Sequence, residues 1–211
     1  MTYLSSTMKI KSLTSLVAIG CGLSVQSSFA AITLTMEQVG NDVVVTSVGG
    51  IFNPVGAGST DFSVTNGDFS GATIPGVAVL FIGTNTDDAD PAMAEWDGAI
   101  VSGPGDFGPG LSTVNATIST GQGFGFNAGG TNTLFVDPDQ LFAPGFSFGV
   151  GSGATWENTT LEALGVTQGT YVWTLDSARF NNDTITLNVI PEPSSALLLS
   201  IAGLGLFRRR R

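Results

Sequence analysis

A group of five carboxylates is the clearest candidate for chemistry in this sequence. Asp87, Asp88, Asp90, Glu95 and Asp97 lie within eleven residues, in a segment that Gly, Pro and Asp interrupt repeatedly. Ca²⁺ takes about six to eight oxygen ligands, and closely spaced carboxylates in a loop supply them. The spacing departs from an EF-hand loop, because no glycine follows where that loop requires one. A calcium site and a solvated acidic loop are therefore both open readings of this segment.

Two carboxylates are also sufficient for glycoside hydrolysis, at about 5 Å apart in retaining enzymes and about 6.5–9.5 Å apart in inverting ones. Nothing in the sequence selects such a pair. Asp137 and Asp139 are a weaker metal candidate, because Pro138 between them favours a simple turn. Trp96 and Trp156 lie in irregular or polar surroundings, so we expect them to be exposed. Exposed tryptophans stack on sugar rings, which makes a Ca²⁺-dependent carbohydrate-binding module an alternative function.

The composition of the middle of the chain excludes several reaction types. Residues 31–190 contain no His, Cys or Lys. Triads that depend on His, cysteine nucleophiles, the usual zinc sites, and Schiff-base or Ser-Lys mechanisms are therefore excluded. The Gly-rich run at 121–126 lacks the context and the lysine of a phosphate-binding loop, and we interpret it as a loop or a bulged strand. We expect a non-enzymatic domain with no cofactor other than Ca²⁺.

Charge is distributed unevenly along the chain, which has 211 residues and a formal net charge of −10. Six of the seven basic residues and one of the seventeen acidic residues lie in the terminal segments. Residues 31–190 therefore carry one arginine against sixteen carboxylates, a net charge of −15. Such a surface repels nucleic acid and anionic lipid headgroups, and it attracts divalent cations or basic partners.

The C-terminal segment has three parts. Pro191, Glu192 and Pro193 form a stiff, non-helical joint, because each proline fixes φ and restricts the residue before it. Residues 196–207 are predominantly apolar. As a helix from Ser194 this run is about 20 Å long, shorter than the about 30 Å hydrocarbon core of a bilayer, and it predicts a short transmembrane helix. The chain then ends in four arginines, which would remain cytoplasmic: Arg208, Arg209, Arg210 and Arg211.

In this order and position the three parts resemble the PEP-CTERM sorting signal that exosortases recognise. The resemblance covers residues 189–211, and residues 165–174 (Gly-Val-Thr-Gln-Gly-Thr-Tyr-Val-Trp-Thr) resemble a segment that recurs before such tails. The resemblance implies export, transient anchoring in the inner membrane and cleavage near Pro-Glu-Pro by an exosortase-type protease. It also implies a final place on the outer surface or in the exopolysaccharide matrix of a Gram-negative-type bacterium. An ordinary C-terminal membrane anchor is the alternative.

Residues 1–30 predict a secretory signal peptide. Lys9 and Lys11 precede an apolar run at 13–25, and a small-x-small cleavage site ends at Ala30, directly before Ala31. The alternative is a lipoprotein signal that ends at Cys21. Cleavage after Ala30 removes Cys21, the only cysteine, so the mature chain would form no disulfide.

Residues 31–188 predict an all-β fold, a single antiparallel β-sandwich-like domain. Alternating runs at 32–37 and 43–48 flank the turn at 40–42 and predict a hairpin. Tyr171, Trp173 and Leu175 share one face of a strand, and the alternation at 185–189 completes a final hairpin that packs in the core. The apolar run at 77–82 suits a buried strand, whereas residues 91–97 are expected to form one helical turn.

Overall fold

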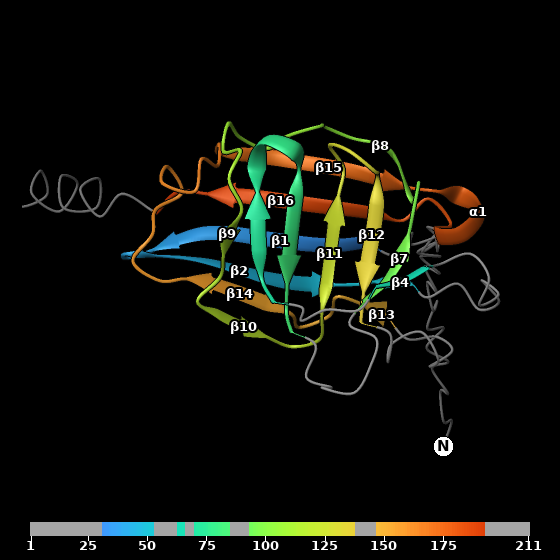
Figure 1. Cartoon of the computed structure of the whole chain (residues 1–211), viewed down its shortest axis with the longest axis horizontal. Coiled ribbons are helices and arrows are strands. Elements are labelled where there is room, and N and C mark those ends of the chain that lie inside the picture. Colours follow the sequence, from blue (N-terminus) through green and yellow to red (C-terminus); the bar gives the residue numbers. More distant parts are fainter. Residues whose placement is uncertain (1–30, 53–62, 66–69, 85–92, 138–146, 193–211) are drawn as a thin grey trace, which may run out of the picture.

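The strands of this domain form two sheets that pack against each other. The computed structural model describes residues 31–52, 63–65, 70–84, 93–137 and 147–192. Figure 1 shows two layers, in which the strands of one sheet run across those of the other. Buried apolar side chains from the facing sides of both layers make one core. The prediction of an all-β domain is therefore confirmed.

The first sheet contains seven strands in the described part of the chain. Across the sheet they are β10 (Ile118–Thr120), β14 (Gly153–Trp156), β2 (Asp42–Gly49), β1 (Ala31–Val39), β16 (Thr184–Ile190), β15 (Gly169–Leu175) and β8 (Ile100–Ser102). β1 and β2 form one antiparallel hairpin, and β15 and β16 form another. Both hairpins confirm the prediction from the alternating apolar pattern.

The first and last strands lie side by side in the middle of this sheet. β1 pairs with β16 in parallel, with Ala31 opposite Thr184 and Glu37 opposite Ile190. The expectation of a purely antiparallel domain is wrong at this pair. Because both strands run in the same direction, the described chain enters the sheet at one end and leaves it at the other.

The second sheet also contains seven strands among the described residues. In order they are β4 (Ser63–Thr65), β7 (Met93–Trp96), β12 (Thr133–Val136), β11 (Phe124–Asn127), β6 (Val79–Ile82), β5 (Ala72–Ile74) and β9 (Val114–Asn115). A small separate sheet pairs β3 (Ile51–Phe52) with β13 (Ser147–Phe148). The run at 121–126, interpreted as a loop or a bulged strand, contributes Phe124 and Phe126 of β11 to the core.

Strand β7 corrects the expectation of a helical turn at residues 91–97. Met93–Trp96 pairs with β12 on one side and with β4 on the other. Ala94 and Trp96 therefore face the core, and both are buried. The helix-favouring residues Ala, Met and Glu do not decide the conformation here, because strand pairing and burial outweigh intrinsic propensity.

Two short helices connect strands in the described part of the chain. The 3-10 helix η1 (Pro75–Val77) joins β5 to β6, and α1 (Ser177–Phe180) joins β15 to β16. The Asp176 carboxylate caps α1 by accepting a hydrogen bond from the Ala178 amide at 2.9 Å, and it also accepts one from Arg179 Nε at 2.8 Å. These two bonds lower the pKa of Asp176 below its ordinary value.

Trp173 of β15 is the aromatic centre of the core. Its side chain is fully buried, and its Nε1 donates a hydrogen bond to the Pro104 carbonyl oxygen at 2.7 Å. Its ring centroid lies 4.6 Å from that of Phe126, which belongs to the opposite sheet. Gly103 has φ +147°, and a Cβ there would lie 2.2 Å from Trp173 Cδ1. Only glycine therefore allows the chain to pass this ring.

Replacing Trp173 tests how the two sheets are held together. We expect Trp173→Ala to lower the free energy of unfolding by about 3–5 kcal/mol, because it removes a buried ring and its hydrogen bond. The adjacent Val172 is 46% exposed, so Val172→Ala should cost less than about 1 kcal/mol. Urea unfolding measures both values, and equal losses would contradict the placement of Trp173.

Candidate functional site

The C-terminal segment leaves the domain directly from its core. Val189 is 3% exposed and lies between Met36 of β1 and Gly169 of β15. Ile190 is the last residue of β16, and its side chain is 44% exposed. Pro191 and Glu192 follow as exposed residues beyond the strand. The Pro-Glu-Pro segment therefore begins immediately after a central strand, with no linker.

Several residues predicted to act in export and anchoring lie outside the described part of the chain. They are Ala30, Pro193, the apolar run at 196–207, Arg208, Arg209, Arg210 and Arg211. Ala31 is described and is the exposed first residue of β1. Among the described residues, none of the helices has the length and apolar character needed to cross a membrane. The signal peptide and the short transmembrane helix stay predictions.

The candidate calcium ligands fall partly within the described residues. Asp87, Asp88 and Asp90 lie outside them, Glu95 belongs to β7, and Asp97 lies in the turn that follows β7. Asp97 Oδ1 accepts a hydrogen bond from the Thr133 hydroxyl at 2.8 Å. No group of three or more His, Cys, Asp or Glu side chains that could hold a metal ion occurs among the residues with described positions. The calcium site therefore stays a prediction.

Arg179 is close to this turn. Its NH1 and NH2 groups donate hydrogen bonds to the carbonyl oxygens of Asp97 at 3.1 Å and of Gly98 at 2.8 Å.

Of the weaker metal candidates, Asp137 is 7% exposed at the end of β12, and Asp139 lies outside the described residues.

The expected exposure of Trp96 and Trp156 is wrong. Trp96 is 2% exposed and Trp156 is 1% exposed, and both side chains lie in the common core. Trp96 packs edge-to-face against Phe180 with ring centroids 5.7 Å apart, and Trp156 Nε1 donates a hydrogen bond to the Val114 carbonyl oxygen at 3.0 Å. Neither ring is available to stack on a sugar. The exposure of these two rings, one of the observations that favoured a carbohydrate-binding module, is therefore removed, and the acidic segment at 87–97 stays as the other.

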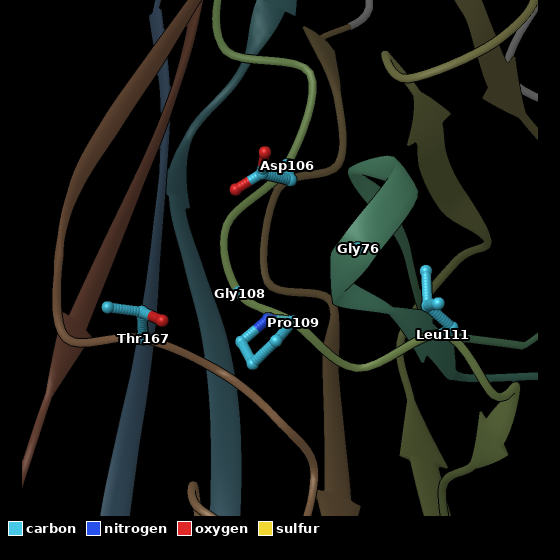
Figure 2. A pocket seen from close by; sticks show the side chains of 6 residues that line it. All are labelled: Gly76, Asp106, Gly108, Pro109, Leu111 and Thr167. Carbon is cyan, nitrogen blue, oxygen red and sulfur yellow. The ribbon is translucent and has the colours of Figure 1, made fainter.

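A shallow hollow of about 420 Å³ opens beside η1. In Figure 2 the side chains of Thr167 and Leu111 lie on opposite sides of this hollow, with Pro109 between them, and the Asp106 carboxylate lies at its rim. Main-chain hydrogen bonds hold its walls together: the Thr167 amide donates to the Phe107 carbonyl oxygen at 2.9 Å, and the Gly110 amide donates to that of Gly165 at 3.1 Å. The segment at 165–174 thus contributes Thr167 to one wall.

Tyr171 lies behind this wall. Its hydroxyl donates a hydrogen bond to the Thr167 carbonyl oxygen at 2.9 Å. Burial raises the pKa of Tyr171 above its ordinary value, and the negative charge of Asp106 raises it further. The phenol is therefore neutral over the physiological pH range.

The chemistry that this hollow can perform is limited by its residues. Asp106 is the one carboxylate among its six lining residues, whereas glycoside hydrolysis needs two. A smaller hollow of about 130 Å³, between β8 and Asn132, is lined by no carboxylate. Neither hollow supports a carboxylate-dependent glycosidase.

The described geometry defines a class of protein. It is an all-β domain in which the central strand β16 continues directly into a Pro-Glu-Pro segment. The family model of the PEP-CTERM protein-sorting motif matches residues 189–211. The C-terminal segment is therefore a PEP-CTERM sorting motif, as its resemblance indicated. No curated protein and no solved structure matches the chain.

The motif implies export across the inner membrane to the cell surface and processing by an exosortase in the membrane. It supports sorting through such a system for a surface protein. Because the motif begins at Val189, its first two residues are also the last two of β16. Strand and sorting motif are thus continuous in this chain.

The pKa of Tyr171 tests the arrangement of the hollow. The chain has two tyrosines, Tyr3 and Tyr171, so Tyr3→Phe leaves a single phenol to titrate by ultraviolet absorbance. We expect its pKa to lie above about 10 and to fall in Asp106→Asn, because one of the two causes is removed. The neutral phenol stabilises the fold below pH about 10, and this contribution is lost as pH rises through the folded pKa.

Asp42→Asn is the matched control for this titration. Asp42 belongs to β2 and does not contribute to the shift, so its replacement should leave the pKa of Tyr171 unchanged. An unchanged pKa in Asp106→Asn would show that Asp106 does not face Tyr171.

Proposed function

We propose that this protein is a non-enzymatic β-domain of the cell surface or extracellular matrix, released there after an exosortase-type protease cuts its C-terminal tail. The observation that carries the proposal is the direct continuation of a central core strand into the sorting motif. The lack of His, Cys and Lys in residues 31–190 supports a non-enzymatic role.

The fold limits where the tail can be cut without damage to the domain. Val189 is buried and pairs with strands on both sides, whereas Pro191 and Glu192 are exposed. A protease needs an accessible, extended segment of main chain, and residues within a central ladder do not provide one. We infer that the cut bond lies after Ile190, so that the released product keeps all of β16.

Changing the motif tests this function. The variant carries Pro191→Ala, Glu192→Ala and Pro193→Ala in the full chain, expressed in a host with an exosortase system. We expect the unchanged chain to be released as a shorter product, whereas the variant should remain full-length in the membrane fraction. Fractionation and immunoblotting against the domain measure both forms.

The control variant carries Ser194→Ala and Ser195→Ala, which change the next two positions and leave the three motif residues intact. It should be processed like the unchanged chain. Release of the motif variant at the normal rate, or an unchanged chain that stays full-length in the cytoplasm, would contradict the proposal.

A further inference from the structure

The hollow beside η1 is built by three segments that contact one another through their main chains. They are η1 itself, the loop before β9 and the loop before β15. The Gly76 amide donates a hydrogen bond to the Gly110 carbonyl oxygen at 2.6 Å, and the Gly110 amide donates one to that of Gly165 at 3.1 Å. A Cβ on Gly108 would collide with the Gly165 carbonyl oxygen. The walls are therefore already held in place, and a ligand would lose little free energy in ordering them.

The hollow carries one charge, and the domain provides nothing to neutralise it. Asp106 is exposed and is the only charged residue in the lining. Arg179 is the one basic residue of the segment 31–190, and it already bonds to Asp176 at 2.8 Å and to the turn after β7. The Asp106 charge also acts toward the wall, since it helps to raise the pKa of Tyr171. The hollow is therefore electrostatically negative.

Hydrogen-bond donors are scarce in the same place. The amides of Gly76 and Thr167 are used within the fold, and Pro109 has no amide hydrogen. Acceptors are present, because the Asp106 carboxylate accepts only and the Thr167 hydroxyl can accept. An anionic ligand would find no positive charge here. A cationic ligand with several donors complements what the lining offers.

We propose that this hollow binds an arginine side chain of a basic partner polypeptide. The guanidinium group donates to the Asp106 carboxylate, and the aliphatic stem packs on Pro109 and Leu111, of which Leu111 is 77% exposed. Figure 2 shows Pro109 between Thr167 and Leu111, with the carboxylate at the rim. The net charge of −15 on residues 31–190 attracts a basic partner from a distance. The inference goes beyond sorting and does not depend on the fate of the tail.

The lining favours arginine over other cations. Ca²⁺ takes about six to eight oxygen ligands, and one carboxylate cannot supply them. Lysine presents a compact, strongly hydrated ammonium group that gains little from an apolar surface. The guanidinium group is planar and more weakly hydrated, so it can bind a carboxylate through two parallel hydrogen bonds and also lie against Pro109.

The size and openness of the hollow predict weak binding of a single residue. Its volume of about 420 Å³ is within the range of about 300–1,000 Å³ for small ligand sites, which is sufficient for one side chain. An exposed ion pair contributes little, and salt screens it. We therefore expect a dissociation constant on the order of 1 mM for one arginine, rising with salt.

Saturation-transfer NMR on the full chain in a neutral detergent tests the proposal. The probe is the blocked peptide acetyl-Gly-Gly-Arg-Gly-Gly-amide at low salt. We expect its arginine methylene protons to receive saturation from the protein. The same peptide with citrulline, which has the shape of arginine without its charge, should not bind, and the lysine peptide should bind several-fold more weakly. Equal binding of the lysine or citrulline peptide would overturn the proposal.

Two variants that each remove one negative charge locate the binding. Asp106→Asn should weaken binding of the arginine peptide about five-fold, the loss expected for one exposed ion pair. Glu157→Gln is the matched control, because Glu157 is exposed and outside the lining, and it should change binding less than about two-fold. Equal losses in the two variants would show attraction to the acidic surface in general and would overturn the proposal.

Tyr171 provides a second readout that reports on the hollow itself. In the Tyr3→Phe chain, saturating arginine peptide should lower the pKa of Tyr171, because the bound guanidinium group offsets the charge of Asp106. Arginine stays protonated at the alkaline pH of this titration. The peptide should cause no such shift when Asp106→Asn is added. A Tyr171 pKa that the peptide leaves unchanged would place the peptide elsewhere and would contradict the proposal.

Discussion

The parallel pairing of the first and last strands is the constraint on which the rest of the domain depends. β1 and β16 occupy the middle of the first sheet, and each contributes a row of buried side chains to the core. Ile32, Leu34 and Met36 face inward on β1, as do Ile185, Leu187 and Val189 on β16. The sheet therefore cannot be completed until the last strand has been made and exported. This pairing is a contact between residues far apart in sequence, which is slow to form but spans the domain.

The same pairing explains how the domain and its tail are connected. Because β16 is central, the sorting motif starts at a rigid point of the fold and not at a flexible end. Pro191 and Glu192 then follow the strand as exposed residues, and Pro191 stiffens this joint. The acidic body carries a net charge of −15, yet its two central terminal strands carry a single carboxylate, Glu37. Charged residues are therefore almost absent from β1 and β16, the two strands that pair.

Local patterns predicted the parts of this structure that depend on neighbouring residues. The turn at 40–42 and the alternation around it are sufficient to define the β1–β2 hairpin, and the alternation of Tyr171, Trp173 and Leu175 places Trp173 in the core. The pairing of β1 with β16 could not be predicted in this way, because no local pattern states which distant strand is the neighbour or in which direction it runs.

The errors at the two other tryptophans have a simpler cause. Ala94 with Trp96, and Ala154 with Trp156, share a strand face at a spacing of two residues, and all four side chains are buried. This short alternation was available in the sequence, but helix-favouring or polar neighbours obscured it. The candidate calcium site stays a prediction, because Asp87, Asp88 and Asp90 lie outside the described residues. The sorting motif was predictable because its three parts are contiguous and need no tertiary contact to be recognised.

The identity of the two ends of the mature protein tests this account most directly. Mass spectrometry of the protein released by its own host should find Ala31 as the first residue and a last residue at or shortly after Ile190. Both terminal strands would then be complete, and the arginines would be absent. A product that ends before Val189, or one that still carries Arg208 to Arg211, would contradict the claim that the sorting tail begins where the central strand ends.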